Sequence, residues 1–514
     1  MYSKVLSAAD FGIDAFPVEI ETHLDNALPS FTVVGLPDSA VKESRERVAA
    51  AIKNSNFVFP AKKITVNLAP ADLRKEGSSF DLPIALGILC SVGFIPQEYL
   101  ESTFALGELS LDGELRPIHG VLPIAICAKE NGIKRLLLPE ENADEAALID
   151  EVEVFPVHSL SQAVEFLLDS TKIDRKVVDL KRIFEEGQLN STIDFSDVKG
   201  QYQVKRALEV AAAGGHNILM IGPPGSGKTM LAKRIPTILP PLTLQESLET
   251  TKIHSVAGML RSNEALVTSR PFRAPHHTIS DAALVGGGVS KIRPGEISLA
   301  HHGVLFLDEL PEFARNVLEV LRQPLEEHSV TISRTRMTID YPANFMLVCS
   351  MNPCPCGNYG NPNIECTCTP TMIQRYLSRI SGPLLDRIDI HIEVPTVKYQ
   401  DMSSTEPAES SASILERVLA ARSIQLKRFS ELKNIYKNAD MDSKSIRKFC
   451  KIDAQSQELL KMAMNKLGFS ARAHDRILKV ARTIADLSAE ETITVKHISE
   501  AIQYRSLDRQ YWKM

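Results

Sequence analysis

The sequence has no segment of the kind that exports a protein or anchors it in a membrane. Residues 1–16 lack a basic region followed by an apolar run and a small-residue cleavage site, so they do not form a secretory signal. The longest apolar stretch, residues 82–95, is too short to cross a bilayer and contains Gly and Ser, which favours a core helix. We therefore expect a cytoplasmic protein without membrane contacts.

The chain also lacks an excess of positive charge and the pattern of a disulfide framework. The 58 Lys and Arg against 64 Asp and Glu give a formal net charge of −6, so any nucleic-acid binding must use local basic surfaces. Eight cysteines in 514 residues without a signal do not predict disulfides. A hydrophobic content of 44% is typical of globular proteins, and the length suggests about three domains.

Composition changes along the chain predict three structured parts and two linkers. They are residues 1–170, with alternating β-like and helical patterns; a charged linker, 171–192; residues 193–400, with apolar strands and helices; a polar linker, 401–413; and a helical part, 414–514. In the central part, the apolar runs 217–221, 304–307 and 345–350 alternate with helical patterns, which predicts a parallel sheet covered on both faces. Ligands bind such sheets at the carboxyl ends of the strands.

A phosphate-binding loop follows the first of these runs. The string GPPGSGKT matches the eight-residue pattern completely and comprises Gly222, Pro223, Pro224, Gly225, Ser226, Gly227, Lys228 and Thr229. Glycines let backbone N–H groups turn towards the phosphates of ATP, Lys228 reaches the β- and γ-phosphates, and the Thr229 hydroxyl binds Mg²⁺. The apolar strand before the loop and the helix formers after it are the context that this motif requires.

Polar residues follow the other two apolar runs. Asp308 comes directly after 304–307 and is expected to join the Mg²⁺ coordination shell. Its neighbour Glu309 is placed to polarise the attacking water as a general base. Asn352 lies at the end of the third run and can orient the same water. Together these residues predict an ATPase that uses ATP and Mg²⁺.

The order of these motifs, followed by LLDRID at 384–389, resembles AAA+ proteins of the magnesium-chelatase and replicative-helicase branch. Longer strings resemble the YifB/ComM family, called magnesium-chelatase-like: RPFRAPHH (270–277), GEISLAH (295–301), DELPEF (308–313), VVGLPD (33–38) and SARA (470–473). The resemblance implies an α/β fold, with an AAA+ P-loop core and a C-terminal helical lid preceded by an N-terminal Lon-protease-like α+β domain. It also implies a ring, expected to be a homo-hexamer with ATP between subunits.

Three arginines have roles that the resemblance implies. Arg387 matches the arginine finger, which reaches into the neighbouring subunit's site and stabilises charge on the transferred phosphoryl group. Arg379 is a second candidate for that role. Arg472 matches the sensor arginine of the lid, which would report loss of the γ-phosphate as domain motion. A surface ion pair is the alternative for each of them.

The N-terminal part resembles the proteolytic domain of Lon at residues 107–118 and 133–140, and in EGSS at 76–79. Ser79 falls near the place of the nucleophile, and such peptidases need a lysine to accept the serine proton. The position that should hold this lysine is Leu122. We therefore expect no peptidase activity, with the domain retained as a ring-forming or DNA-contacting platform.

Four cysteines lie between Asn352 and Arg387, and they are Cys354, Cys356, Cys366 and Cys368. Two C-x-C pairs separated by a nine-residue loop can form a tetrahedral site, and thiolates suit Zn²⁺. We expect a structural Zn²⁺ that rigidifies this connection; reduced structural cysteines and disulfides are the alternatives. His276 and His277 are expected to form hydrogen bonds, because adjacent histidines rarely share one metal.

Residues 329–341 form two short alternating patterns, which predicts a hairpin. In the related helicases a hairpin at this place projects into the ring pore, so Arg334 and Arg336 are candidates for contacts with DNA phosphates. A solvated edge hairpin is the alternative. Residues 444–482 contain ten Lys or Arg against three acidic residues, which fits either a solvated helix face or a nucleic-acid surface.

Three functions compete on these observations. The resemblance favours a hexameric DNA helicase or branch-migration enzyme that acts on branched or single-stranded DNA in recombination or natural transformation. A chelatase-type ATPase that remodels a protein partner is the alternative, and the fused Lon-like domain and the cysteine cluster argue against it. Leu122 argues against an ATP-dependent protease. We expect the DNA motor.

Overall fold

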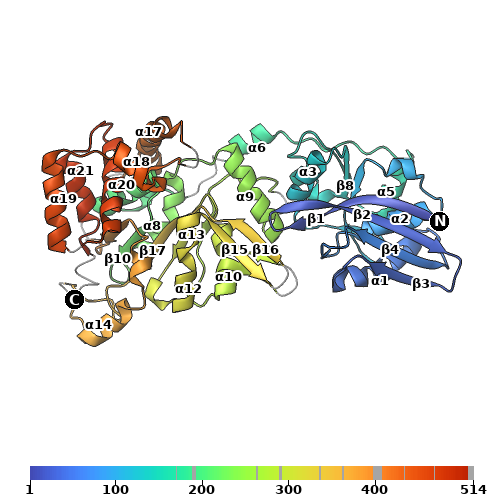
Figure 1. The fold of residues 1–514 in the computed structure, drawn as a ribbon, viewed down its shortest axis with the longest axis horizontal. Coiled ribbons are helices and arrows are strands. Elements are labelled where there is room, and N and C mark those ends of the chain that lie inside the picture. The colour runs from blue at the N-terminus through green and yellow to red at the C-terminus, as the bar shows by residue number, and fades with distance from the viewer. Residues whose placement is uncertain are drawn as a thin grey trace.

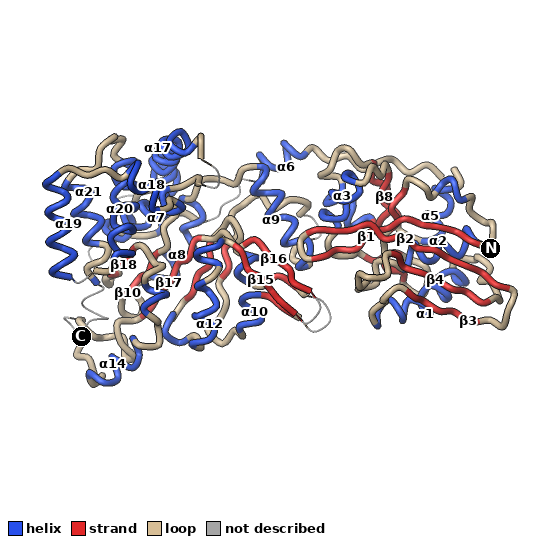
Figure 2. Tube along the Cα trace, in the orientation of Figure 1, coloured by secondary structure: helices blue, strands red, loops and turns tan. Residues whose placement is uncertain are grey.

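The computed structural model describes residues 1–169, 171–187, 193–261, 264–288, 292–334, 337–361, 364–397, 408–432, 435–467 and 469–507. Three parts follow one another along the long axis of the molecule, with the N-terminal sheet at one end and a helical lid at the other (Figure 1). Figure 2 shows strands in the first two parts and helices joined by loops in the lid. Among the described residues, no helix has the length and apolar character needed to span a bilayer.

A seven-stranded mixed sheet organises the N-terminal part, in the strand order β3-β4-β2-β1-β5-β8-β9. Its elements are β1 (Tyr2–Phe11), β2 (Asp14–Asp25), β3 (Ser30–Val34), α1 (Ser39–Asn54), β4 (Lys63–Ala69), α2 (Asp81–Ser91), β5 (Thr103–Ala105), β6 (Glu108–Leu109), β7 (Leu115–Arg116), α3 (Val121–Glu130), β8 (Arg135–Pro139), α4 (Ala143–Ala146), β9 (Glu153–Val157) and α5 (Leu160–Leu167). Helix α2 packs on β1 and β2 beneath α1, and α3 also contacts these strands. Every residue of α2 is buried, which confirms the core helix predicted from the apolar stretch.

The central part contains a five-stranded sheet in the order β11-β14-β17-β10-β18, with every pair parallel. Its elements, with the helix that precedes them, are α6 (Leu180–Gly187), α7 (Tyr202–Gly214), β10 (Ile218–Ile221), α8 (Lys228–Arg234), α9 (Leu244–Ala257), β11 (Phe272–Arg273), α10 (Asp281–Val285), β12 (Gly286–Gly287), β13 (Arg293–Pro294), α11 (Glu296–Leu299), β14 (Val304–Leu307), α12 (Arg315–Glu319), α13 (Pro324–Glu327), β15 (Ser329–Arg334), β16 (Met337–Pro342), β17 (Met346–Met351), α14 (Pro370–Leu377), α15 (Gly382–Leu385) and β18 (Ile390–Glu393). The three apolar runs predicted as strands are β10, β14 and β17.

Both faces of this parallel sheet are covered, as its apolar strands predict. Along β14, Val304 and Phe306 join one hydrophobic cluster with α7 and the lid helices. The alternate residues, Leu305 and Leu307, join a second cluster on the opposite face. This arrangement confirms the predicted fold class, an α/β AAA+ core with a helical lid and a separate N-terminal α+β part.

The lid consists of α17 (Ser411–Phe429), α18 (Ser443–Phe449), α19 (Ala454–Leu467), α20 (Ala471–Leu487) and α21 (Val495–Gln503). A buried polar network joins α20 to the sheet. Asp389 lies 3.1 Å from His216 Nδ1 and pairs with Arg476 of α20, while His216 Nε2 lies 2.8 Å from Thr483 Oγ1. Burial alone would raise the pKa of Asp389, but Arg476 and His216 hold it below its ordinary range. The last residue of the LLDRID string therefore anchors the lid.

Helices occur in both segments that composition identified as linkers. Helix α6 lies within 171–192, and its Leu180, Ile183 and Phe184 pack against the N-terminal core at the i, i+3, i+4 spacing of an amphipathic helix. Helix α17 begins at Ser411, within 401–413, because Ser410 caps it by accepting a hydrogen bond from the backbone of the third helical residue. The composition of these segments did not predict the helices, because charged and polar residues outnumber the few apolar residues that each helix buries.

The N-terminal part contacts the central part through α3 and α9. The N–H of Gly120 donates to the carbonyl oxygen of Ser255 at 3.2 Å, and Lys252 pairs with Asp14 at 2.8 Å. Next to these contacts, the backbone of Gly258 lies against the ring of His119, so there is no room for a side chain at position 258. These contacts place the tip of the β1–β2 hairpin beside the central part (Figure 1).

Candidate nucleotide site and cysteine cluster

The phosphate loop joins β10 to α8, and glycines determine its path. A Cβ at Gly222 would lie 2.3 Å from the carbonyl oxygen of Val394, so a larger residue cannot occupy this position. Gly227 has a φ of 87°, a left-handed conformation that favours glycine. Lys228 Nζ donates to the carbonyl oxygens of Gly222 at 2.7 Å and Pro223 at 2.9 Å, and burial lowers the pKa of this lysine. The loop thus surrounds a cationic centre.

Two oxygen groups that fit Mg²⁺ lie next to this loop. Thr229 Oγ1 donates to Asp308 Oδ2 at 2.7 Å, and Ser350 donates to the other oxygen of the same carboxylate. Hydroxyl and carboxylate oxygens are ligands that Mg²⁺ prefers, so Thr229 and Asp308 would hold the ion. Ser350 was not predicted. Its position follows from the register of β14 and β17, in which Leu307 lies opposite Cys349.

The predicted base and water-orienting residue lie at the same edge of the sheet. Glu309 is half exposed, and its carboxylate lies 3.7 Å from His277 Nδ1. Asn352 Oδ1 accepts a hydrogen bond from Lys228 Nζ at 3.3 Å. Asn352 therefore lies beside Lys228, which the γ-phosphate would contact, and Glu309 lies at the end of the neighbouring strand β14. The motif did not predict that His277 would lie next to Glu309, the predicted base.

The predicted arginine finger is buried in the single chain. Arg387 is 7% exposed, and it donates to the carbonyl oxygen of Pro383 at 2.6 Å and to the carboxylate of Glu326 at 2.5 Å. Arg379, the second candidate, is 49% exposed and pairs with Glu312 at 2.7 Å. To act in a neighbouring subunit, Arg387 would first have to leave Glu326.

Fewer basic residues are exposed on the lid than the sequence contains between 444 and 482. Arg472, the predicted sensor arginine, is exposed at the second position of α20. The exposed basic residues between 444 and 482 are Lys444, Arg447, Lys448, Lys451, Lys461, Lys466 and Arg472. The other three are held within the fold: Arg476 by Asp389, Lys479 by the carbonyl oxygen of Ala439, and Arg482 by Asp486.

Strands β15 and β16 form the predicted hairpin, antiparallel from Ser329 opposite Pro342 to Arg334 opposite Met337. Arg334 is the last residue of β15, and Arg336 lies outside the described residues. The N-terminal part rests on this hairpin, because a Cβ at Gly12, in the β1–β2 turn, would lie 2.7 Å from Ile339 Cγ2. The hairpin is therefore supported on one side by the chain's own N-terminal sheet.

The region that resembles the Lon proteolytic site has a serine and an apolar helix. Ser79 is half-buried, and Leu122 is fully buried in α3. The lysine of α3, Lys129, pairs with Glu151 at 2.6 Å. Lys75, near Ser79 in sequence, directs its ammonium group to two backbone carbonyl oxygens of the preceding loop.

We expect the wild-type protein and a Ser79→Ala variant to leave fluorescent casein equally intact, with or without ATP. A serine hydroxyl without an adjacent base is a weak nucleophile, and the helix position that should supply the base carries Leu122. Casein fluorescence over time measures the effect, with a Lon protease as the positive control. Degradation by the wild type that Ser79→Ala abolishes would show that this prediction is wrong.

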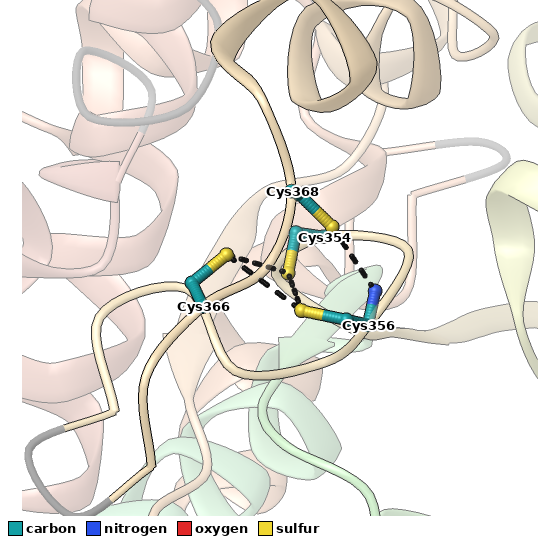
Figure 3. Close-up of side chains that lie close together, drawn as sticks. All are labelled: Cys354, Cys356, Cys366 and Cys368. Carbon is teal, nitrogen blue, oxygen red and sulfur yellow. Dashed lines mark hydrogen bonds between the residues drawn. The ribbon is translucent and has the colours of Figure 1, made fainter.

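The four cysteine sulfurs converge from two loop segments, one after β17 and one before α14 (Figure 3). The Sγ–Sγ distances are 3.4 Å between Cys354 and Cys356, 3.7 Å between Cys354 and Cys366, and 3.6 Å between Cys356 and Cys366. The fourth sulfur, of Cys368, accepts a hydrogen bond from the N–H of Cys356 at 3.4 Å. All four sulfurs lie within 4.8 Å of one another, so the C-x-C spacing does form one cluster.

A second group of metal-ligand residue types is better explained by hydrogen bonds. His302 Nε2 lies 2.8 Å and His301 Nε2 lies 3.7 Å from the carboxylate of Glu249. His301 Nδ1 accepts a hydrogen bond from the N–H of Asn344 at 3.0 Å, which leaves the ring proton on Nε2, facing the carboxylate. Hydrogen bonds from His301 and His302 lower the pKa of Glu249 to about 2.

Three family models match the chain in succession. "Subunit ChlI of Mg-chelatase" matches residues 20–142, "Magnesium chelatase, subunit ChlI" matches 194–402, and "Magnesium chelatase, subunit ChlI C-terminal" matches 408–505. The first match covers most of the N-terminal part. Together the three matches reach all three parts of the chain.

Individual relatives extend the comparison over the full length. Competence protein ComM of Haemophilus influenzae is 46% identical over 99% of this chain and 98% of its own length. The uncharacterized protein YifB of Escherichia coli is also 46% identical, over 99% of this chain and 97% of its own. Lon protease 2 of Bacillus subtilis is 30% identical over 27% of this chain and 25% of its own length, in keeping with the Lon-like N-terminal part. The chain therefore belongs to the magnesium chelatase subunit ChlI family, together with ComM and YifB, and this membership implies an AAA ATPase that hydrolyses ATP.

Proposed function

We propose that this protein is an ATP-driven motor on branched or single-stranded DNA, a hexameric helicase or branch-migration enzyme in recombination or natural transformation. One observation carries the proposal most. The hairpin β15–β16 leads directly into β17, and β17 ends at Asn352, which accepts a hydrogen bond from Lys228. A change at the γ-phosphate would therefore reach the hairpin through a single strand.

The basic residues of the chain and its similarity to a competence protein support DNA as the substrate. Arg334 ends β15, Arg336 comes two residues later in the sequence, and arginines at the end of a hairpin strand suit backbone phosphates without reading sequence. The exposed basic residues of the lid offer a second surface for phosphates. The name of the Haemophilus relative, a competence protein, associates it with competence, and we extend a role in transformation from that name.

Ring assembly follows from the same proposal, with ATP between subunits and an arginine supplied in trans. We expect Arg387→Ala to lose ATPase activity and to regain part of it when mixed with Glu309→Gln subunits. In mixed rings, Glu309→Gln subunits supply the missing arginine to sites that still have Glu309. The measurement is phosphate release by each variant alone and by the mixture.

The matched control for this mixing experiment is Arg379→Ala, because Arg379 is the exposed alternative. If only the Arg379→Ala protein is rescued by mixing, Arg379 is the finger. In that case Arg387, buried against Glu326, has a structural role within its own subunit.

The second candidate function is ATP-driven remodelling of a protein partner. It is favoured by the three matches to magnesium chelatase subunit ChlI, which together span most of the chain. The two candidates differ in what stimulates the motor. We expect a four-way DNA junction to bind the protein and raise its ATPase rate, with binding that weakens as salt rises because phosphate contacts release counterions. An ATPase that no junction, single strand or duplex binds or stimulates would favour remodelling instead.

A further inference from the structure

The cysteine cluster has the dimensions of a tetrahedral metal–thiolate site. A Zn–S bond of about 2.3 Å places the sulfurs of a Cys₄ site about 3.8 Å apart, whereas a disulfide needs about 2.05 Å. The separations of 3.4, 3.6 and 3.7 Å among Cys354, Cys356 and Cys366 fit thiolates around one ion and are too long for disulfides, and the sulfur of Cys368 lies within 4.8 Å of the other three. Backbone N–H groups donate to the sulfurs of Cys354, from Tyr359 at 3.3 Å, and Cys368. Such donors commonly surround metal-bound ligands.

The loop that carries these cysteines packs against the hydrophobic cluster beside the sheet but has no regular secondary structure in its described part. Residues 353–361 and 364–369 contain no helix or strand. A cross-link between the two C-x-C pairs would close this segment, and binding a metal at a site that the unfolded chain lacks contributes directly to folding. The four convergent sulfurs are thus suited to fix the path of the chain between β17 and α14.

This segment lies directly on the nucleotide site. Gly357, in the turn after Cys356, has a φ of 82°, and a Cβ there would lie 2.4 Å from Cδ and 2.8 Å from Cγ of Pro224 in the phosphate loop. At the start of the same segment, Asn352 lies two residues before Cys354 and accepts a hydrogen bond from Lys228. The cysteine loop therefore contacts the nucleotide site at two points.

We propose that Cys354, Cys356, Cys366 and Cys368 bind one Zn²⁺, and that the ion holds Gly357 against Pro224 and Asn352 beside Lys228, so that ATP hydrolysis depends on zinc. Four thiolates would fill the coordination shell of the ion and leave no position for a substrate, so the zinc would not take part in the reaction. It would instead affect the rate of hydrolysis by holding the loop in place. The proposal uses the ATPase activity that family membership implies, and it is independent of DNA as the substrate.

Metal content tests the first half of the proposal. We expect elemental analysis of the full-length protein to give close to one zinc per chain, and a Cys354→Ser/Cys356→Ser variant to lose it. The control is Cys90→Ser, a cysteine of the N-terminal part whose thiol donates to Gln97, a contact that serine can replace. A wild-type protein without zinc, or equal zinc in both variants, would overturn the assignment.

A pair of glycine variants tests the second half without removing a ligand. Gly357 and Gly360 have φ values of 82° and 79°, so alanine strains the backbone similarly at both. Only Gly357 contacts Pro224; a Cβ at Gly360 has no described atom within 4 Å. We expect Gly357→Ala to keep its zinc. Its kcat/KM for ATP hydrolysis should fall about 10-fold or more, since misplacing a reacting group by about 1 Å can lower a rate about 100-fold. Gly360→Ala should retain the wild-type value.

Zinc removal should give the same result in the wild type. After treatment with a zinc chelator and return to excess Mg²⁺ and ATP, we expect turnover to fall and to recover when Zn²⁺ is added back. If the zinc-free protein hydrolyses ATP at the original rate, or if the two glycine variants behave alike, the ion does not act through the phosphate loop.

Discussion

A Glu309→Gln variant should bind ATP with near-normal affinity and hydrolyse it at least about 100-fold more slowly than the wild type, since a general base contributes about 10²- to 10⁴-fold. The amide keeps the size and hydrogen-bonding capacity of the carboxylate but cannot accept the water's proton. Lys228 donates its hydrogen bonds to the carbonyl oxygens of the loop, whereas Glu309 lies against His277, so binding should survive. Phosphate release and fluorescent-nucleotide titration separate the two effects.

The matched control for this variant is Glu327→Gln, an exposed glutamate of α13 that pairs with Gln323. It makes the same charge change outside the nucleotide site and should leave both measurements unchanged. Turnover by Glu309→Gln close to the wild-type rate would mean that another group activates the water. His277, 3.7 Å from Glu309, would then be the next residue to test.

A Lys228→Ala variant should lose ATP binding itself. The lysine is the buried cation at the centre of the phosphate loop, and a hydrogen bond to a charged group contributes about 1.5–3 kcal/mol, which corresponds to about a 10- to 100-fold loss of affinity. Nucleotide titration measures the loss directly, and hydrolysis should fall with it. The affinity for ATP therefore distinguishes this variant from Glu309→Gln.

The control for Lys228→Ala is Lys233→Ala, on the exposed side of the same helix α8. Removing that ammonium group should change neither affinity nor turnover. Normal ATP binding by Lys228→Ala would contradict the placement of the phosphates in this loop. A loss shared equally by both lysine variants would indicate damage to α8 instead of loss of a phosphate contact.

The parts of the site that sequence predicted are those whose chemistry needs contiguous residues. The phosphate loop requires its glycines, Lys228 and Thr229 in a fixed order, so the motif places them before any tertiary structure is known. The C-x-C pairs similarly predict a cluster, because close spacing and a turn suffice to bring four sulfurs together. The parallel sheet followed from its apolar strands, which alternate between two buried faces.

What sequence could not give depends on strand order and on distant packing. Ser350 reaches Asp308 only because β14 and β17 are neighbours, although β15 and β16 intervene in the chain. The contact of Gly357 with Pro224 joins segments more than a hundred residues apart. The burial of Arg387 against Glu326 likewise follows from the packing of α13, so a motif that implies an exposed arginine finger does not reveal its environment.

The most direct test of the proposed motor is strand release from a labelled four-way DNA junction, with wild type beside Glu309→Gln. The account predicts that the wild type separates the junction only with ATP and Mg²⁺, and that Glu309→Gln binds the junction without separating it. Strand release that needs no ATP, or none at all despite vigorous ATP hydrolysis by the wild type, would contradict the DNA motor.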